Sequence, residues 1–525
     1  MKLEGTKMTK FYRTDRIGLA IVTATFLFAY IGTSQTAEYD QPYRPQVHFS
    51  PRRNWTNDPN GLVFFHGEYH LFYQYNPFGD QWGHMSWGHA VSADMLHWKE
   101  LPVAIPEKDG VMTFTGSVVI DEHNTGGFCD AKPVCMVAIY TGASNTPNGP
   151  RQSQNIAYSR DDGRTWTRYS GNPVLDLKLA DFRDPSVSWD EEEHRWLMAV
   201  SLAAEHKVRF YASPNLRQWT MLSDFGPMGD IDGVWECPDL LHVPDADGHG
   251  PGIWALKIGL NPGALQGGSG EQYFLGSFDG KNFTVSSTRG SHGWTDYGKD
   301  DYCAISFNHL PEGQHPVLLG WMDNWQYANR LPTSPWRGQM TLPRRVSLVR
   351  DETGLSLRQE PIVEPLRSTN RPAVISSSSA LEESAQQVPF ELDIQFTTVG
   401  KEIFGVRVYS DEQHWTEIAY DTIKNEFYID RTKSGLTVSP DFLVRTSAPL
   451  AVGRPLDLRV VVDRSSVEAF AQNGTIAMTN LIYPVTTGSR TKIETFSNGK
   501  NVGMKGQIWN LQSVWSSGKF PNEGR

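Results

Sequence analysis

The sequence has few cysteines, and they are not arranged like metal ligands. Only four are present in 525 residues, at positions 129, 135, 237 and 303, too few for a small disulfide-stapled protein. No pair has zinc-ligand spacing, and the histidines of His66-Gly67-Glu68-Tyr69-His70 do not form the HExxH pattern of zinc proteases. Gly67 favours a hairpin here, so we expect no metal. Cys129 and Cys135 flank a short loop and could pair in an oxidising compartment.

Long basic runs and long helical patterns are also missing. The chain has 48 Lys and Arg against 59 Asp and Glu, a formal charge of −11. This balance argues against nucleic acid or an anionic membrane surface as the main partner. No long segment has the 3.6-residue period of an amphipathic helix, which disfavours parallel α/β folds. The length favours two domains, and 39% hydrophobic residues are enough for packed cores.

One N-terminal stretch is apolar enough to direct export. Five basic residues precede the apolar run 17–31, which is within the range of a signal-peptide core and short for a membrane span. We place the signal peptide at residues 1–37, with cleavage after Ser34 or a retained anchor as alternatives. The mature protein is then expected to be secreted or periplasmic, without membrane association.

Residues 45–355 have the pattern of a β-propeller. Short apolar and aromatic runs alternate with Gly, Pro, Asn and Asp, as in a series of short strands. A degenerate unit of strand, acidic or amide turn and aromatic residue recurs about every 50–70 residues, near the length of a four-stranded blade. That period predicts about five blades. A ring of blades would bring distant residues together at one axial funnel.

The remainder of the chain alternates apolar and polar residues over many short strands. We expect a linker at residues 356–380 and an antiparallel β-sandwich at 381–518, with a mainly structural role. The predicted fold class is therefore all-β, a five-bladed β-propeller followed by a β-sandwich.

Three acidic residues of the propeller region stand in similar surroundings. Asp58, Asp184 and Glu236 are each bracketed by aromatic or apolar residues and followed closely by proline. Asn60-Gly61 is a turn signal, so we expect Asp58 at the tip of a strand that continues into 62–65. The alternative for each acid alone is an ordinary turn or a solvated carboxylate. Their positions on different predicted blades instead indicate one active site.

The expected surroundings assign different roles to the three acids. A carboxyl in an apolar wall retains its proton and can act as a general acid, whereas one beside an arginine or several amides stays ionised. We therefore expect Glu236 to be the proton donor and Asp58 the anionic attacker. Asp184 would be a fixed negative charge held by Arg183.

The motifs around these acids resemble those of glycoside hydrolase family 32, the β-fructosidases that include invertases, inulinases and levanases. The resemblance extends over nearly all of the mature chain. The matching motifs are Asn57-Asp58-Pro59-Asn60-Gly61, Phe72-Tyr73-Gln74-Tyr75-Asn76-Pro77, Gln81-Trp82-Gly83, Phe114-Thr115-Gly116-Ser117, Arg183-Asp184-Pro185, Glu236-Cys237-Pro238, Trp321-Met322-Asp323-Asn324-Trp325 and, in the second domain, Asp463-Arg464-Ser465-Ser466-Val467-Glu468-Ala469-Phe470.

The resemblance implies a five-bladed propeller with an appended β-sandwich, and hydrolysis of β-linked fructofuranosides with retention. Asp58 would be the nucleophile, Glu236 the acid and base, and Asp184 the residue that holds the fructose hydroxyls. No metal or organic cofactor is expected, because a carboxylate pair suffices for acetal cleavage. The residues expected to line the fructose subsite are Asn57, Gln74, Trp82, Ser117, Arg183 and Trp325. The alternatives are blade packing for the two tryptophans and a strand-end hydroxyl for Ser117.

The substrate expected from the resemblance is levan or inulin, hydrolysed from the chain end, with sucrose as a lesser substrate. Fructosyl transfer, endo-acting hydrolysis, a non-catalytic fructan-binding propeller and an arabinan hydrolase are the alternatives.

Overall fold

The computed structural model describes residues 39–515. The gaps within this range are 131–133, 247–251, 287–291, 352–353, 369–370, 376–385, 397–400, 451–455, 486–489 and 499–502. The predicted signal peptide and much of the predicted linker lie outside the described residues. Among the described residues, no helix is long and apolar enough to cross a membrane.

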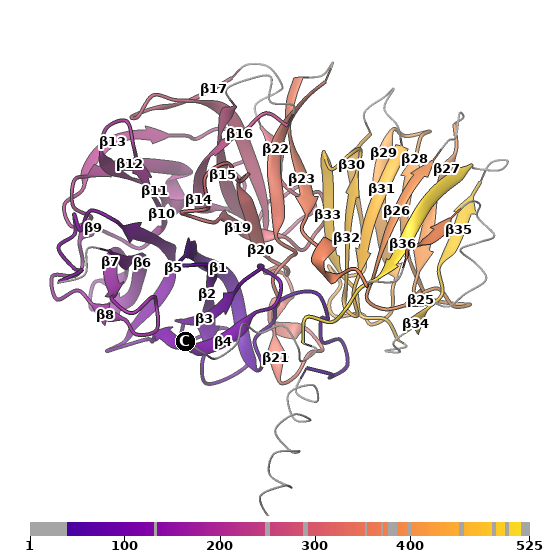
Figure 1. The fold of residues 1–525 in the computed structure, drawn as a ribbon, viewed down its shortest axis with the longest axis horizontal. Helices are drawn as coiled ribbons and strands as arrows, with labels where there is room; N and C mark the ends of the chain where they lie inside the picture. Colours follow the sequence, from indigo (N-terminus) through magenta and orange to yellow (C-terminus); the bar gives the residue numbers. More distant parts are fainter. Residues whose placement is uncertain are drawn as a thin grey trace, which may run out of the picture.

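Antiparallel sheets follow one another through the first part of the chain (Figure 1). The first contains β1 (Asn54–Phe65), β2 (Glu68–Asn76), β3 (Ser86–Ser92) and β4 (Lys99–Ile105), with β21 (Trp336–Arg337) parallel to β1. The second contains β5 (Val111–Asp121), β6 (Cys135–Thr146), β7 (Gly149–Ser159), β8 (Thr167–Arg168) and β9 (Leu175–Leu179). The third contains β10 (Phe182–Asp190), β11 (Arg195–Leu202), β12 (Lys207–Ser213) and β13 (Thr220–Phe225).

Two more sheets complete this part of the chain. One contains β14 (Val234–Val243), β15 (Ile253–Asn261), β16 (Gly270–Phe278), β17 (Phe283–Val285) and β18 (Gly293–Trp294). The other contains β19 (Tyr302–Ser306), β20 (Val317–Trp321), β22 (Arg344–Asp351) and β23 (Gly354–Pro361). Short 3₁₀ turns lie at η1 (Ala203–Glu205), η2 (Ala328–Arg330) and η3 (Glu364–Leu366).

The first strands of these sheets contact one another in a closed ring. β1 contacts β5, β5 contacts β10, β10 contacts β14, β14 contacts β19, and β19 contacts β1. Radial sheets whose innermost strands surround one axis are the arrangement of a propeller. The all-β propeller predicted from the sequence is thus confirmed. β23 continues to Pro361, past the boundary predicted at residue 355.

The second part of the chain is a β-sandwich (Figure 1). One sheet contains β24 (Ala373–Ile375), β36 (Met504–Asn510), β26 (Phe390–Phe396), β31 (Leu456–Val462), β32 (Ser466–Ala471) and β33 (Ile476–Leu481). The other contains β30 (Arg445–Pro449), β29 (Glu426–Lys433), β28 (Trp415–Asp421), β27 (Ile403–Val408) and β35 (Glu494–Ser497). A small pair joins β25 (Gln386–Gln387) to β34 (Arg490–Thr491).

The sandwich core follows from the alternation seen in the sequence. Alternate residues of β26, namely Phe390, Leu392, Ile394 and Phe396, are buried in one apolar cluster with residues of the facing sheet. Successive side chains of a strand point to opposite faces, so a period of two buries one face. The predicted sandwich is confirmed by this packing.

Buried ion pairs join the two domains. Arg431 of the sandwich donates to Asp300, which precedes β19, at 2.6 Å. His48 lies before β1 and is bracketed by Asp463 and Glu468 of the sandwich, at 2.8 and 2.7 Å. Charges buried this deeply are stable only when paired. The sandwich therefore contacts the start of the propeller chain and the segment before its last sheet.

Candidate active site

Each inner strand of the propeller carries a register shift at a similar place. The shifts lie between Thr56 and Pro59 in β1, Thr113 and Gly116 in β5, Arg183 and Ser186 in β10, Glu236 and Asp239 in β14, and Tyr302 and Ile305 in β19. A β-bulge leaves a residue unpaired and re-aims its side chain, and bulges are common beside active sites. All three candidate acids lie at these shifts.

Asp58 is therefore not in a turn, and the turn predicted at this motif is wrong. β1 runs through the motif as one 12-residue strand. The bulges accommodate Asn57, Pro59 and Gly61, residues that ordinarily interrupt a regular ladder. Gly61 has φ +51°, and a Cβ there would lie 2.6 Å from a methyl group of Val118. The bulged strand, rather than a hairpin, holds Asp58.

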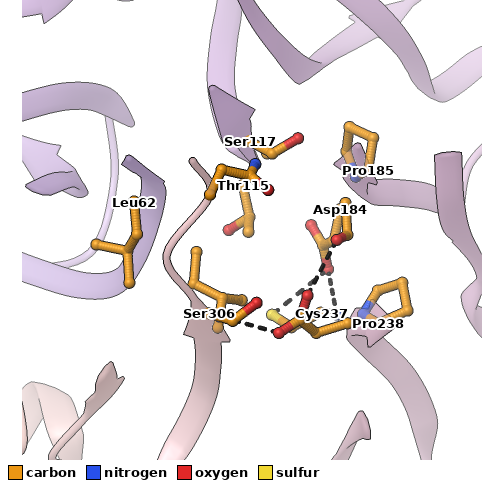
Figure 2. Close-up of a pocket in the computed structure, with 13 residues that line it drawn as sticks. Leu62, Thr115, Ser117, Asp184, Pro185, Cys237, Pro238 and Ser306 are labelled. Atoms are coloured by element: carbon orange, nitrogen blue, oxygen red, sulfur yellow. Dashed lines mark hydrogen bonds between the residues drawn. The ribbon is translucent and has the colours of Figure 1, made fainter. Parts of the chain in front are cut away.

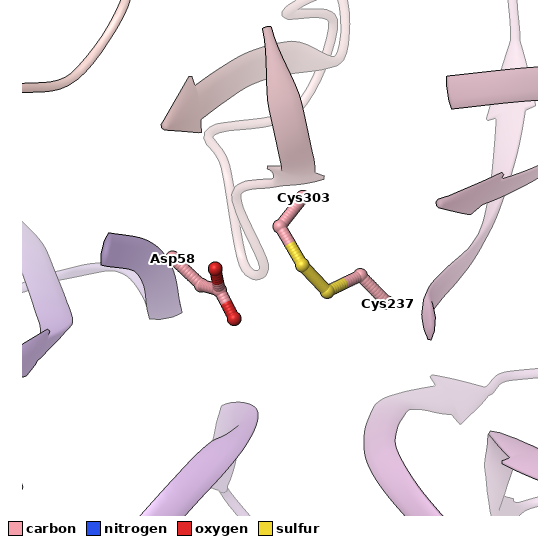
Figure 3. A group of neighbouring side chains, drawn as sticks. All are labelled: Asp58, Cys237 and Cys303. Carbon is pink, nitrogen blue, oxygen red and sulfur yellow. A yellow bond between two sulfur atoms is a disulfide. The ribbon is translucent and has the colours of Figure 1, made fainter. Parts of the chain in front are cut away.

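The three acids meet around a disulfide between Cys237 and Cys303. A carboxylate oxygen of Asp58 lies within 4.8 Å of both sulfur atoms, and Figure 3 shows the Asp58 carboxylate beside the S–S bond. Asp184 Oδ2 lies 3.8 Å from the Cys237 sulfur, and Glu236 is the preceding residue of β14. Since both sulfurs are bonded to each other, they are not the thiolates that a metal ion requires.

Asp58 has one held oxygen and one without a partner. Thr115 of β5 donates its hydroxyl to Oδ2 at 2.8 Å. Oδ1 is buried and accepts no hydrogen bond from any described residue. Burial among the inner strands raises the pKa of Asp58 to about 6; the Asn57 and Thr115 side chains favour the ionised form and oppose this shift, and the Glu236 charge adds to it. Thr115 therefore holds the carboxylate in place.

Asp184 is held by the backbone of β14. The Cys237 N–H donates to Asp184 Oδ2 at 3.0 Å, a contact drawn in Figure 2. Burial raises the pKa of Asp184 to about 7; the Arg183 charge opposes this, and the Glu236 and Asp58 charges add to it. Three carboxyls in one place cannot all ionise freely. Ionisation of one carboxyl in this cluster therefore disfavours ionisation of the others.

Glu236 does not lie in an apolar wall, contrary to the sequence prediction. Arg183 donates from Nε to Glu236 Oε1 at 3.0 Å, and the Tyr302 hydroxyl donates to Oε2. Arg183 also donates to Asp181, and it acts on Asp184 through its charge. Both oxygens of Glu236 are thus oriented by partners, with the side chain 18% exposed.

A small cavity lies on the propeller axis beside these acids. It has a volume of about 20 Å³ and is lined by Ser117, Asp184, Asp239 and Ser306, among others (Figure 2). That is room for about one water molecule. Asp239 accepts from the Ser186 hydroxyl at 3.1 Å and from the Ser306 N–H at 2.9 Å, so its carboxylate ties three inner strands together.

Comparison with known proteins matches both domains. The model of the "Glycosyl hydrolases family 32 N-terminal domain" matches residues 48–361, and that of the "Glycosyl hydrolases family 32 C terminal" matches residues 355–511. The chain belongs to glycosyl hydrolase family 32. It is therefore a glycoside hydrolase, and the family resemblance read from its motifs is confirmed.

Similar family-32 proteins include two fructan hydrolases. The chain is 41% identical to a levanase of Bacillus subtilis (strain 168), over 93% of this chain and 73% of that protein. It is 37% identical to an extracellular exo-inulinase of Aspergillus awamori, over 94% of this chain and 99% of that protein. The crystal structure of exo-inulinase from Aspergillus awamori superposes with a TM-score of 0.83 at 36% identity, covering 91% of this chain and all of that one.

Several predicted binding residues of this family-32 hydrolase adjoin the acids. Asn57 precedes Asp58, and its Oδ1 accepts from the Trp55 indole at 2.7 Å. Trp325 stacks on Trp55 at 5.9 Å and is partly buried. Trp82 is 42% exposed and its ring meets Phe114 edge-on at 6.2 Å. Trp82 is therefore the more exposed of the two rings, whereas Trp325 is also part of the aromatic packing.

Two other predicted binding residues have structural partners. The Ser117 hydroxyl accepts from the Val187 N–H at 2.9 Å and lines the axial cavity. Gln74 is 2% exposed, and its side-chain N–H donates to the side-chain oxygen of Asn60 at 3.1 Å. These contacts join strands and leave little of either side chain for a ligand.

The sequence reasoning missed three features of this site. Thr115 lies within the motif Phe114-Thr115-Gly116-Ser117, so its position in that motif could have identified it. Tyr302 and Cys303 lie outside every quoted motif, and only the fold brings them to Glu236. Cys129 and Cys135 do pair, but the second disulfide joins residues 66 apart in sequence, which spacing alone does not reveal.

Proposed function

We propose that this hydrolase releases fructose from the ends of levan or inulin, and also cleaves sucrose, with retention through a covalent fructosyl-enzyme. The observation that carries the proposal is the meeting of Asp58, Asp184 and Glu236 at the inner strands of the propeller. The names of the similar levanase and extracellular exo-inulinase support a fructan substrate. They also support export, as does the apolar N-terminal stretch.

In the first half of the reaction, the Asp58 carboxylate attacks the anomeric carbon while Glu236 gives its proton to the glycosidic oxygen. The bond to the leaving group breaks, and an ester forms between Asp58 and fructose. A carboxylate nucleophile and a carboxylic acid on opposite sides of the scissile bond are the requirements of a retaining glycosidase. Arg183 and Tyr302 hold the two Glu236 oxygens in fixed directions for this transfer.

In the second half, Glu236 takes a proton from water and the resulting hydroxide attacks the anomeric carbon. The ester breaks and Asp58 becomes a carboxylate again. Asp184, which accepts from the Cys237 N–H of β14, binds fructose hydroxyls in this proposal. The same arrangement permits a sugar hydroxyl to replace water, so hydrolysis and transfer differ only in the acceptor.

Product analysis tests the proposal directly. Levan, inulin and sucrose are each incubated with the purified protein, and products are followed in time by chromatography. Exo-hydrolysis gives fructose from the first time point, endo-hydrolysis gives oligosaccharides first, and transfer gives products longer than the substrate. A protein that releases nothing from any fructoside but cleaves arabinan would overturn the proposal.

Stereochemistry tests retention separately. Proton and carbon NMR at early times should show the β-anomer of fructose before mutarotation. First release of the α-anomer means inversion and removes Asp58 from the nucleophile role. Denaturation of the protein during turnover, followed by peptide mass analysis, should locate one fructosyl unit on the Asp58 peptide.

A further inference from the structure

The disulfide at the centre of the site joins two strands that no backbone ladder connects. Cys237 belongs to β14 and Cys303 to β19, which lie in different sheets. The two strands are neighbours around the ring. Among the described residues, the S–S bond is a covalent link across this boundary, and Figure 3 shows it facing the Asp58 carboxylate.

The residues just before each cysteine are also linked. Glu236 precedes Cys237, Tyr302 precedes Cys303, and the Tyr302 hydroxyl donates to Glu236 Oε2. Tyr302 is 1% exposed, so its hydroxyl has little freedom to move. A covalent bond and a hydrogen bond from adjacent residues thus hold the same two segments together.

The two segments need such a restraint because their backbones are unusual. Cys237 has φ 47° and Cys303 has φ 49°, the left-handed region that side chains other than glycine rarely adopt. Each lies at the register shift of its strand. Strained positions persist when surrounding structure over-determines them.

From this geometry we infer that the Cys237–Cys303 disulfide and the Tyr302 hydroxyl together position Glu236 for proton transfer, so that reduction of this one disulfide slows turnover without unfolding the protein. The inference rests on the proposed role of Glu236. Tyr302, Cys237 and Cys303 are positioning residues that act through Glu236.

The reduction step is ordinary thiol–disulfide exchange with an added dithiol. One thiolate of the reductant attacks a cysteine sulfur, forming a mixed disulfide and releasing the other cysteine as a thiolate. The second reductant thiol closes a ring and releases the first cysteine. The cysteine pair gains two electrons and two protons, and the dithiol is oxidised. The two thiols cannot remain as close as two bonded sulfurs, and both are at most 2% exposed, so the segments must separate.

The buried Cys129–Cys135 disulfide provides a matched background. It lies within the second sheet region, in an apolar cluster with Phe128 and Val137. In the double variant Cys129→Ala/Cys135→Ala, the effect of a reductant on activity comes from Cys237–Cys303 alone. In Cys237→Ala/Cys303→Ala, a reductant should leave the already lowered activity unchanged.

Two kinds of substrate distinguish a displaced Glu236 from general damage to the active site. Sucrose and levan have alcohol leaving groups that need the Glu236 proton, whereas an aryl β-fructofuranoside with an acidic phenol does not. Reduction of Cys129→Ala/Cys135→Ala should lower kcat on levan roughly 10- to 100-fold, the cost of a displacement near 1 Å. The rate of fructosylation by the aryl fructoside and the KM for levan should change little. The circular dichroism spectrum should remain that of the native protein.

Tyr302→Phe tests the same link without altering either cysteine. It should also lower kcat on levan more than the rate of fructosylation by the aryl fructoside, with little change in KM. Equal losses on both substrates, or a loss confined to KM, contradict positioning of Glu236.

Alkylation under native conditions provides the remaining control. Mass spectrometry should find no reactive thiol in the untreated Cys129→Ala/Cys135→Ala protein and two after reduction, with restored activity on reoxidation. Two thiols before reduction, or two after reduction with full activity on levan, overturn the inference. An untreated wild-type protein that is inert toward levan, inulin, sucrose and the aryl fructoside instead means that the proposed function has failed.

Discussion

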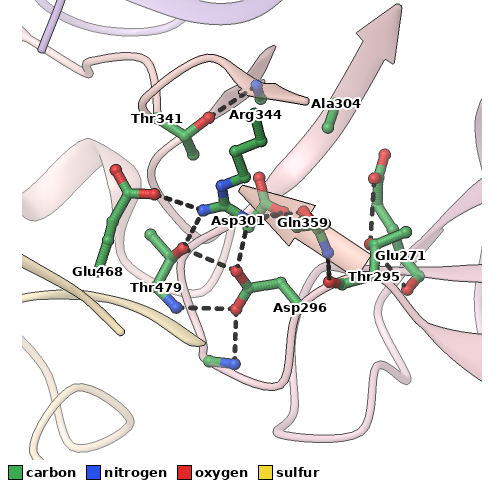
Figure 4. A network of polar contacts seen from close by, with 12 residues as sticks. Glu271, Thr295, Asp296, Asp301, Ala304, Thr341, Arg344, Gln359, Glu468 and Thr479 are labelled. Atoms are coloured by element: carbon green, nitrogen blue, oxygen red, sulfur yellow. Dashed lines mark hydrogen bonds and ion pairs between the residues drawn. The ribbon is translucent and has the colours of Figure 1, made fainter. Parts of the chain in front are cut away.

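Arg344 of the last propeller sheet donates to Glu468 of the sandwich at 2.5 Å (Figure 4). The same guanidinium donates to Asp296 at 2.9 Å and lies 3.6 Å from Asp301. Arg344 is 2% exposed, and Glu468 is fully buried. Glu468 belongs to a motif that the sequence shares with family 32, so this part of the motif holds the two domains together rather than binding sugar.

Replacement of Arg344 should destabilise the whole chain. Arg344→Met leaves the Asp296 carboxylate buried without its cation, while Glu468 keeps only His48, and a broken buried pair costs about 3–5 kcal/mol. Chemical denaturation monitored by fluorescence measures the loss. The control Arg209→Met removes the solvent-accessible pair with Asp224 and should cost about 0–1 kcal/mol. Equal losses in the two variants would contradict a special role for the interface.

His48 should make stability fall in alkaline solution. Hydrogen bonds and charges from Asp463 and Glu468 outweigh burial and raise the pKa of His48 from 6.5 to about 9. Because the folded-state pKa is the higher one, this stabilisation is complete below about pH 6.5 and is lost as the pH rises through about 9. Its size is on the order of 3 kcal/mol. Unfolding free energies of the wild type and His48→Gln, measured from pH 6 to pH 10, should converge toward the alkaline end.

Thr115 should set the acid limb of activity. Attack requires ionised Asp58, whose pKa is about 6, so kcat/KM should fall as the pH drops through about 6. Thr115→Val removes a hydrogen bond that favours the carboxylate, so the limb should move to higher pH. Thr115→Ser retains the hydroxyl and should leave the limb in place. Superimposable profiles for Val and Ser would exclude this role.

The two principal acids should differ in their dependence on the leaving group. Asp58→Asn should lower kcat on every fructoside by on the order of 10⁴-fold or more, since nothing replaces the nucleophile. Glu236→Gln should lower kcat on levan roughly 10²- to 10⁴-fold, the usual share of general acid catalysis. Its first step with an aryl fructoside should be nearly intact, seen as a burst of phenol in stopped-flow measurements. Near-normal levan hydrolysis by either variant removes that residue from its role.

The fold class could be predicted because its signals are local. Period-two alternation, as at Phe390, Leu392 and Ile394, reports a half-buried strand wherever it occurs. Asp58 shows the limit of that reasoning, because Asn, Pro and Gly read as a turn in isolation and the adjoining strands instead accommodate them in bulges. A local sequence pattern predicts which secondary structure a segment prefers, whereas the neighbouring strands determine which one it adopts.

The acids could be found from motifs, but their partners could not. The sequence placed Arg183 beside Asp184, whereas the bulge turns its guanidinium toward Glu236. Ser117 looked like a sugar contact, yet its hydroxyl meets the Val187 backbone of the next sheet. Tyr302 can donate a hydrogen bond to Glu236 only because the sheets of the propeller close into a ring. Contacts between sheets depend on geometry that no single stretch of sequence encodes.

Ring closure also bears on how the protein is made. β1 carries Asp58 and emerges first from the ribosome, while its neighbours β19 and β21 are translated near the end of the propeller. Until then the nascent chain has Asp58 but neither Tyr302 nor the partner of Cys237. The side chains around Glu236 can therefore come together only after the last blade has been made.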